Sequence, residues 1–183
     1  MKLSALRQAF ILVSMASAGG CISVDLPADS ERPVANGLNL VNGEFLNEPT
    51  YRSHRLGNTG PPDLASVFGE PPLPHAHIDS VSMSFSEANG LVVRFISRSK
   101  VVGGRTITKK DGLSETPSAL SIRDAGCAGP GLGLGCSADS YLIYVDKHDE
   151  LVVVSTTVGA GIVILVPMAG YKKLMSTFQR LVR

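Results

Sequence analysis

Tryptophan is absent from this chain of 183 residues, and the other aromatic residues are few: six phenylalanines and four tyrosines. Charged residues are also scarce, at 18%, and 17 basic residues nearly balance 16 acidic ones to leave a net charge of +1. A protein so close to neutral lacks the basic surface that nucleic acid binding requires, so we expect no nucleic acid partner. The 44% of hydrophobic residues is typical of a globular protein, and the length suits one domain of ordinary size.

Cysteine is the next scarce residue, and it occurs only at Cys21, Cys127 and Cys136. An odd number of cysteines in an exported protein indicates that one thiol has a role outside disulfide pairing. The question is therefore whether the chain is exported, and which thiol stands apart.

The first twenty residues have the pattern of an export signal. Lys2 and Arg7 are the only charged residues before Cys21, and residues 9–18 (AFILVSMASA) form a short apolar run that ends in small side chains. The run is too short to cross a bilayer as a permanent helix. The alternative is a buried N-terminal helix of the folded domain. We predict that residues 1–20 are a signal peptide.

Two cleavage sites compete at the end of this signal. The triplet Ala16–Ala18 (ASA) fits the rule for ordinary secretion. The stretch Ala18–Cys21 (AGGC) resembles the lipobox of bacterial lipoproteins, with Ala18 standing where leucine is usual. The resemblance implies that the thiol of Cys21 receives a diacylglyceryl group and that Cys21 becomes the N-terminus. An even pair of cysteines then remains.

The same resemblance implies a place for the protein. Ile22 follows the cysteine, where an aspartate would indicate retention in the inner membrane, so we expect the inner leaflet of the outer membrane. The membrane is then a partner through the lipid on Cys21. Residues 21–38 read as a lipidated N-terminus and flexible tether, and residues 39–183 as one periplasmic domain. The chain after Cys21 is loosely similar to small envelope lipoproteins, which brings no activity with it.

Alternation dominates the chain from residue 78 onward. Val81, Met83 and Phe85 alternate with serines, as expected of a half-buried strand, and Asn89-Gly90 predicts a hairpin turn after them. A short helix is expected near 62–69, and the spacing of apolar residues predicts a C-terminal helix packed on the sheet. Its expected stripe consists of Tyr171, Leu174, Met175, Phe178, Leu181 and Val182. We therefore predict an α+β fold with a mostly antiparallel sheet of hairpins.

The uncharged run 151–171 offers an alternative, because 21 residues without a charge can span a bilayer as a helix. This would make the chain an inner-membrane protein. Its β-branched residues and the glycines at 159 and 161 favour instead two strands joined near Gly159–Gly161, which is the structure we predict.

The stretch 127–136 (CAGPGLGLGC) lacks the spacing of a phosphate-binding loop and has no lysine after it. A disulfide between Cys127 and Cys136 would close this glycine-rich loop and stabilise the fold. We predict that disulfide.

His75, His77 and Asp79 alternate, so on a strand all three would share a face that could hold a metal ion. The simpler interpretation is a polar entry into a strand. These residues support the alternative of a periplasmic enzyme or metal-binding protein.

Basic residues concentrate on the strands that we expect next. Those that could contact an anionic envelope component are Arg94, Arg98, Lys100 and Arg105. The simpler interpretation is a solvated face that also protects a sheet edge. We expect no catalytic residue and no cofactor, and we predict a lipid-anchored envelope protein that acts by binding or structural interaction, with another envelope protein as a further possible partner.

Overall fold

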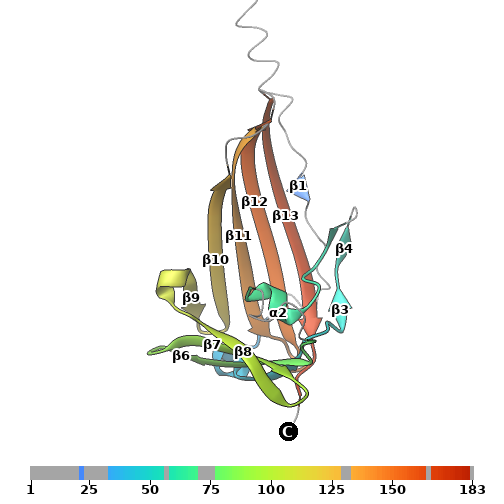
Figure 1. Cartoon of the computed structure of the whole chain (residues 1–183), viewed down its shortest axis with the longest axis vertical. Helices are drawn as coiled ribbons and strands as arrows, with labels where there is room; N and C mark the ends of the chain where they lie inside the picture. Colours follow the sequence, from blue (N-terminus) through green and yellow to red (C-terminus); the bar gives the residue numbers. More distant parts are fainter. Residues whose placement is uncertain are drawn as a thin grey trace, which may run out of the picture.

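The computed structural model describes residues 21–22, 33–55, 58–69, 77–128, 133–163 and 166–181. Their structure is dominated by a seven-stranded sheet, here called the large sheet, and a four-stranded sheet, here called the small sheet. Figure 1 shows the long strands β10 to β13 running far beyond the small sheet, which lies across their lower end.

The large sheet has the order β1-β13-β12-β11-β10-β9, and β3 pairs with the same edge of β13 as β1 does. Its pairs are antiparallel except β1 with β13. Its strands are β1 (Cys21–Ile22), β3 (Tyr51–Arg52), β9 (Leu113–Thr116), β10 (Ala119–Ala128), β11 (Gly133–Val145), β12 (Leu151–Val163) and β13 (Val166–Phe178).

The small sheet is antiparallel, in the order β2-β6-β7-β8. It consists of β2 (Gly43–Leu46), β6 (Ser80–Ser86), β7 (Gly90–Ser97) and β8 (Lys100–Ile107). A further pair joins β4 (His54–Arg55) to β5 (Asn58–Thr59). The helical elements are η1 (Gly37–Val41), α2 (Leu64–Val67) and η2 (Lys109–Asp111).

The main core lies between the two sheets, on the face of the large sheet that we call the inner face. Alternating residues of four long strands build its lower part, and buried residues of the small sheet and α2 belong to the same cluster. The inner-face members include Leu120, Ile122, Ile143, Leu151, Val153 and Phe178, and the residues that complete the core include Leu64, Phe68, Val81, Met83, Phe85, Leu91 and Phe95. The predicted alternation of Val81, Met83 and Phe85 is confirmed.

The opposite face of the large sheet, the outer face, carries a second buried cluster at its lower end. This cluster consists of Ala119, Tyr144, Val152, Val154 and Met175. The lower parts of β12 and β13 are therefore buried on both faces, and apolar residues occur there at consecutive positions as well as at alternate ones.

The predicted α+β class is wrong, because the described residues form a β-rich fold in which α2 is the one α-helix. The predicted short helix is confirmed over Leu64–Val67. The C-terminal helix is wrong, since β13 continues to Phe178 and pairs with β12 throughout. Burial of both Leu174 and Met175, on opposite faces of one strand, imitates the spacing of a helical stripe.

The described residues of 151–171 run as strands, as predicted, but the turn between the strands was placed wrongly. Gly159 and Gly161 lie within β12, and the connection to β13 falls between Val163 and Val166. Within the described residues, no helix has the length and apolar character needed to cross a membrane.

The predicted signal peptide, residues 1–20, lies outside the described residues, as does most of the predicted tether. The helical turn η1 begins at Gly37, so the folded domain starts within the range that was predicted as tether. The two-residue strand β1 pairs in parallel with β13, which places Cys21 beside Tyr171 and Ile22 beside Lys172.

Candidate functional site

The helix α2 lies at the centre of the candidate site, and three hydrogen bonds fix its first turn. Asp63 Oδ1 accepts from the Ser66 backbone N–H at 2.8 Å, which is a side-chain N-cap. The side-chain oxygen of Asn47 accepts from the Ala65 N–H at 2.8 Å, and the Asn47 carbonyl accepts from Leu64. Leu64, Ala65 and Val67 are buried, so the short helix is held by both its cap and the core.

Two adjoining cavities flank α2, and both have Ser66, Val67 and Tyr141 in their walls. The larger cavity, of about 540 Å³, has charged side chains of both signs in its lining. They are Arg105, Lys110, Asp111 and Asp124. Arg123 also borders the cavity, where its backbone N–H donates to Gly112, but strand alternation places its side chain on the outer face. Ile107 and Ile122 provide an apolar floor, so the cavity combines apolar contact with several charged groups, as ligand sites commonly do.

Arg105 is positioned in the larger cavity by the backbone of the segment that follows α2. Its Nη1 donates to the Phe68 carbonyl at 3.1 Å. Arg105 pairs with Val93 in the small sheet, and Val93 is fully buried, so the arginine projects on the side of the sheet that faces the core.

The smaller cavity, of about 290 Å³, includes Arg52, Thr157 and Lys172 in its wall. Arg52 Nη2 donates to Thr59 Oγ1 at 2.9 Å and to the Gly60 carbonyl at 3.3 Å, which holds the guanidinium in place. This cavity therefore offers two cations and a threonine, and would suit a ligand with an anionic group.

Tyr141 separates the two cavities, and burial raises the pKa of its phenol, with further contributions from the nearby carboxylates of Asp139 and Asp124. The phenol therefore stays protonated at neutral pH and can donate a hydrogen bond to a ligand. Asp139 itself accepts from Thr157 Oγ1 at 2.6 Å, across β11 and β12.

The described lining of the two cavities contains no histidine or cysteine. The walls of both cavities provide hydrogen-bonding groups and side chains of both charges, and the strands that carry them are held by a common core. We call the two cavities together the Tyr141 cleft, and its chemistry is that of a binding site for a polar ligand.

The structure separates the four basic residues that the sequence predicted as an anionic contact. Arg94, Arg98 and Lys100 are exposed, with Arg98 in the turn between β7 and β8 at a φ of 48°. Arg105 is exposed as well, but it lies in the lining of the Tyr141 cleft. The reason is the alternation of strands: Arg94 pairs with Gly104, so Arg105 projects from the opposite face.

The predicted metal residues do not assemble into a site within the described part of the chain. His75 lies outside it, and His77 Nε2 is 3.5 Å from Asp79 Oδ1, at an exposed position. The other carboxylate oxygen of Asp79 accepts from the backbone N–H of Arg98 at 2.5 Å. Among the described residues, no three histidine, cysteine or acidic side chains come together as metal ligands.

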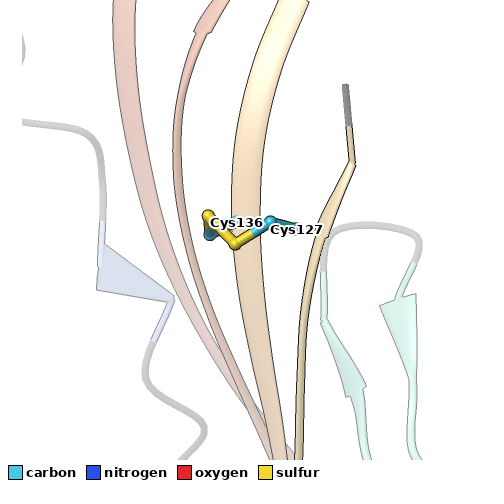
Figure 2. The surroundings of a disulfide bond; sticks show 2 residues. All are labelled: Cys127 and Cys136. Carbon is cyan, nitrogen blue, oxygen red and sulfur yellow. A yellow bond between two sulfur atoms is a disulfide. The ribbon is translucent and has the colours of Figure 1, made fainter. Parts of the chain in front are cut away.

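The predicted disulfide is confirmed. Cys127 and Cys136 are directly opposite each other in β10 and β11, and their sulfur atoms are bonded, as Figure 2 shows. Tyr141, Arg123 and Lys172 were not predicted as site residues. The alternation in SYLIYVD (140–146) could have indicated that Tyr141 shares a face with the buried Ile143, but only the pairing of strands reveals what lies beside it.

In comparisons with known proteins, no family model, no curated protein and no solved structure matches the chain.

Proposed function

We propose that the chain is a bacterial lipoprotein of the cell envelope, anchored through lipid on Cys21, whose domain faces the periplasm and acts by binding. One observation carries the proposal. Of the three cysteines, Cys127 and Cys136 bond to each other, which leaves Cys21 without a cysteine partner in the chain. That remaining cysteine is the one preceded by the small residues Ala18, Gly19 and Gly20.

Lipid has to supply the anchoring energy in this proposal. Cleavage before Cys21 removes Lys2 and Arg7 and leaves a chain close to neutral, so no polybasic segment contributes. A single acyl chain holds a protein only marginally, whereas two or three give stable attachment, at about 0.8 kcal/mol per buried methylene. Ile22 after the cysteine supports a destination in the outer membrane rather than retention in the inner one.

The Tyr141 cleft is the binding site that we assign to the periplasmic domain. Arg52 and Lys172 on one side of Tyr141 and charges of both signs on the other suit an anionic or zwitterionic group of an envelope component, or a charged segment of another envelope protein.

Mass spectrometry of the mature N-terminus, from protein extracted with membranes, tests the proposal. We expect an N-terminal Cys21 carrying acyl chains, and a Cys21→Ser variant that is neither acylated nor retained in the membrane fraction. An N-terminal Gly19, produced by ordinary cleavage after Ala18, would contradict it.

A further inference from the structure

Charged residues occur along only part of the length of the large sheet. Asp124, Asp139, Thr157 and Lys172 form one row across β10 to β13. We call everything beyond this row, toward the ends of these strands farthest from the small sheet, the far half. The residues that build it lie within 125–138 and 158–171, and neither range contains an aspartate, glutamate, lysine or arginine.

The two faces of the far half differ in their side chains. On the inner face, the row that contains Gly126 continues through Ser137, Gly159 and Gly170, so this row has almost no side chains. On the outer face, the row nearest the charges is apolar and consists of Ala125, Ala138, Val158 and Tyr171. The disulfide and Ala160 follow in the next outer-face row.

This outer surface is open to solvent. Val158 is 50% exposed, and Ala125, Ala138 and both bonded cysteines are exposed as well. An apolar surface of this kind, on a projecting part of a protein, is typical of an interaction site.

The charges that border the far half also divide between the two faces. Arg123 and Lys173 belong to the outer-face row through Ser140 and Thr156, which has no acidic member. The carboxylates of Asp124 and Asp139 belong to the inner face, together with Lys172. The outer face therefore combines an apolar area with a cationic border, which is the pattern that an anionic lipid surface attracts.

We propose that the outer face of the far half lies on the anionic lipid surface to which the protein is anchored. The inference rests on the proposed lipidation, because β1 pairs Cys21 with Tyr171 and so brings the acylated residue to the edge of the first apolar row. Arg123 and Lys173 meet the headgroup phosphates, and Val158 enters the upper acyl region.

The open edge of the sheet sets the depth of this contact. β9 covers only Ala119–Ile122 of β10, so within the described residues the edge from Asp124 to Ala128 has no strand beside it. Its backbone N–H and C=O groups need water, which the hydrocarbon core does not supply. The face therefore rests in the interface, at a depth of about 5–10 Å, and the glycine-rich inner face stays in water.

The absence of tryptophan provides the test, because a single introduced tryptophan gives an unmixed signal. Mature acylated protein that begins at Cys21 and carries Val158→Trp is reconstituted in vesicles that contain anionic lipid with brominated acyl chains. We expect a blue-shifted emission that the bromines quench. Val101→Trp, at a 62% exposed position of β8 in the small sheet, is the matched control and should remain unshifted and unquenched.

A second pair of variants tests the cationic border. Adding Arg123→Glu and Lys173→Glu to the Val158→Trp protein should reduce the quenching several-fold on anionic vesicles. Adding Arg94→Glu, the control on the small sheet, should leave the quenching unchanged. Ala125→Trp, on the same face and row as Val158, replaces the first probe if that variant fails to fold.

The outcomes separate the two proposals. Acylated protein in which both far-half probes behave like the Val101→Trp control overturns this inference and leaves the anchoring intact. A blue shift without vesicles, in protein that sediments as an oligomer, also overturns it, because a second copy then covers the face. If Cys21 proves unacylated, the lipoprotein proposal fails, and the same probes in vesicles decide whether the face binds lipid by itself.

Discussion

Gly60 lies against the carbonyl oxygen of Met175, and a β-carbon built on Gly60 would come within 2.2 Å of that oxygen. The contact follows from two backbone hydrogen bonds through Ser53, whose N–H donates to Met175 and whose carbonyl accepts from Gly60. The segment before α2 is thereby held against β13, where it forms part of the wall of the Tyr141 cleft.

Replacement of Gly60 by alanine should therefore destabilise the protein, by about 1–3 kcal/mol, because the backbone has to move to admit the methyl group. Urea unfolding of the two proteins measures the difference. Gly126→Ala is the control, since no atom lies within 4 Å of a β-carbon at that position and the change should stay within about 0.5 kcal/mol. Equal effects of the two substitutions would show that the close approach to Met175 is not rigid.

Arg180 joins the end of the chain to the segment around η1. Its Nε donates to Asp149 Oδ1 at 2.8 Å, its Nη1 and Nη2 donate to the carbonyls of Asn42 and Leu40, and its guanidinium lies 4.7 Å from the centre of the Phe45 ring. We expect Arg180→Ala to lower the free energy of unfolding by about 2–3 kcal/mol, because it removes charged hydrogen bonds and a cation–π contact together.

The exposed partner serves as the control for Arg180. Asp149→Asn removes the charge of a solvated ion pair, keeps a residue type that tolerates the φ of 62° at this position, and should change stability by less than about 1 kcal/mol. Arg180→Lys keeps the charge but loses the planar fork, so its stability should fall between those of the wild type and Arg180→Ala. A lysine variant as stable as the wild type would mean that charge alone matters there.

The disulfide should contribute measurably to stability. Reduction, or the double change Cys127→Ser and Cys136→Ser, removes a constraint on a ten-residue loop and should lower the free energy of unfolding by about 2.5–3 kcal/mol in the chain-entropy account. Denaturant unfolding with and without reductant measures this. The serine variant should not respond to reductant, and an unchanged midpoint for the wild type under reduction would contradict the prediction.

Tyr141 should make stability depend on pH in the alkaline range. Its pKa is raised above the ordinary value of 10.0, so the folded protein keeps the phenolic proton to a higher pH than the unfolded chain does. Stability is therefore unaffected by this group below its unfolded pKa and declines as the pH rises from there through the folded pKa.

In Tyr141→Phe the alkaline decline in stability should be smaller, and one late-ionising tyrosine should be lost from an absorbance titration of the folded protein. Tyr51, which is exposed at 43%, provides the matched control, because Tyr51→Phe should leave the late-ionising tyrosine in place. If the late ionisation step disappears in Tyr51→Phe, that step belongs to Tyr51 and the prediction for Tyr141 is wrong.

The local pattern of the chain predicted the β6–β7 hairpin and the disulfide, because each depends on a few neighbouring residues. Alternation from Val81 to Phe85 needs only one buried face, and Cys127 and Cys136 were the one pair left once Cys21 was set apart. The C-terminal helix failed for a non-local reason, since β13 is buried on both faces: Phe178 belongs to the core between the sheets and Met175 to the cluster on the outer face.

The candidate site was even less accessible to sequence reasoning. Tyr141 gains its environment from Asp124 and α2, which lie 17 and more residues away, and nothing near it in the sequence indicates a cavity. Likewise Arg123 and Lys173 are 50 residues apart, and only the pairing of β10 to β13 puts them in one row.

The cross-link between Cys127 and Cys136 also determines which side chains face which way. Strands rich in glycine and alanine have little side-chain packing to specify their register, and a slip by one residue turns every side chain of a strand to the other face. In β10 such a slip would bring Asp124 to the outer face in place of Arg123. Because the two cysteines are directly opposite, their bond allows only one alignment of β10 with β11. The oxidation that forms the bond would thus also determine the sign of the charge on this face.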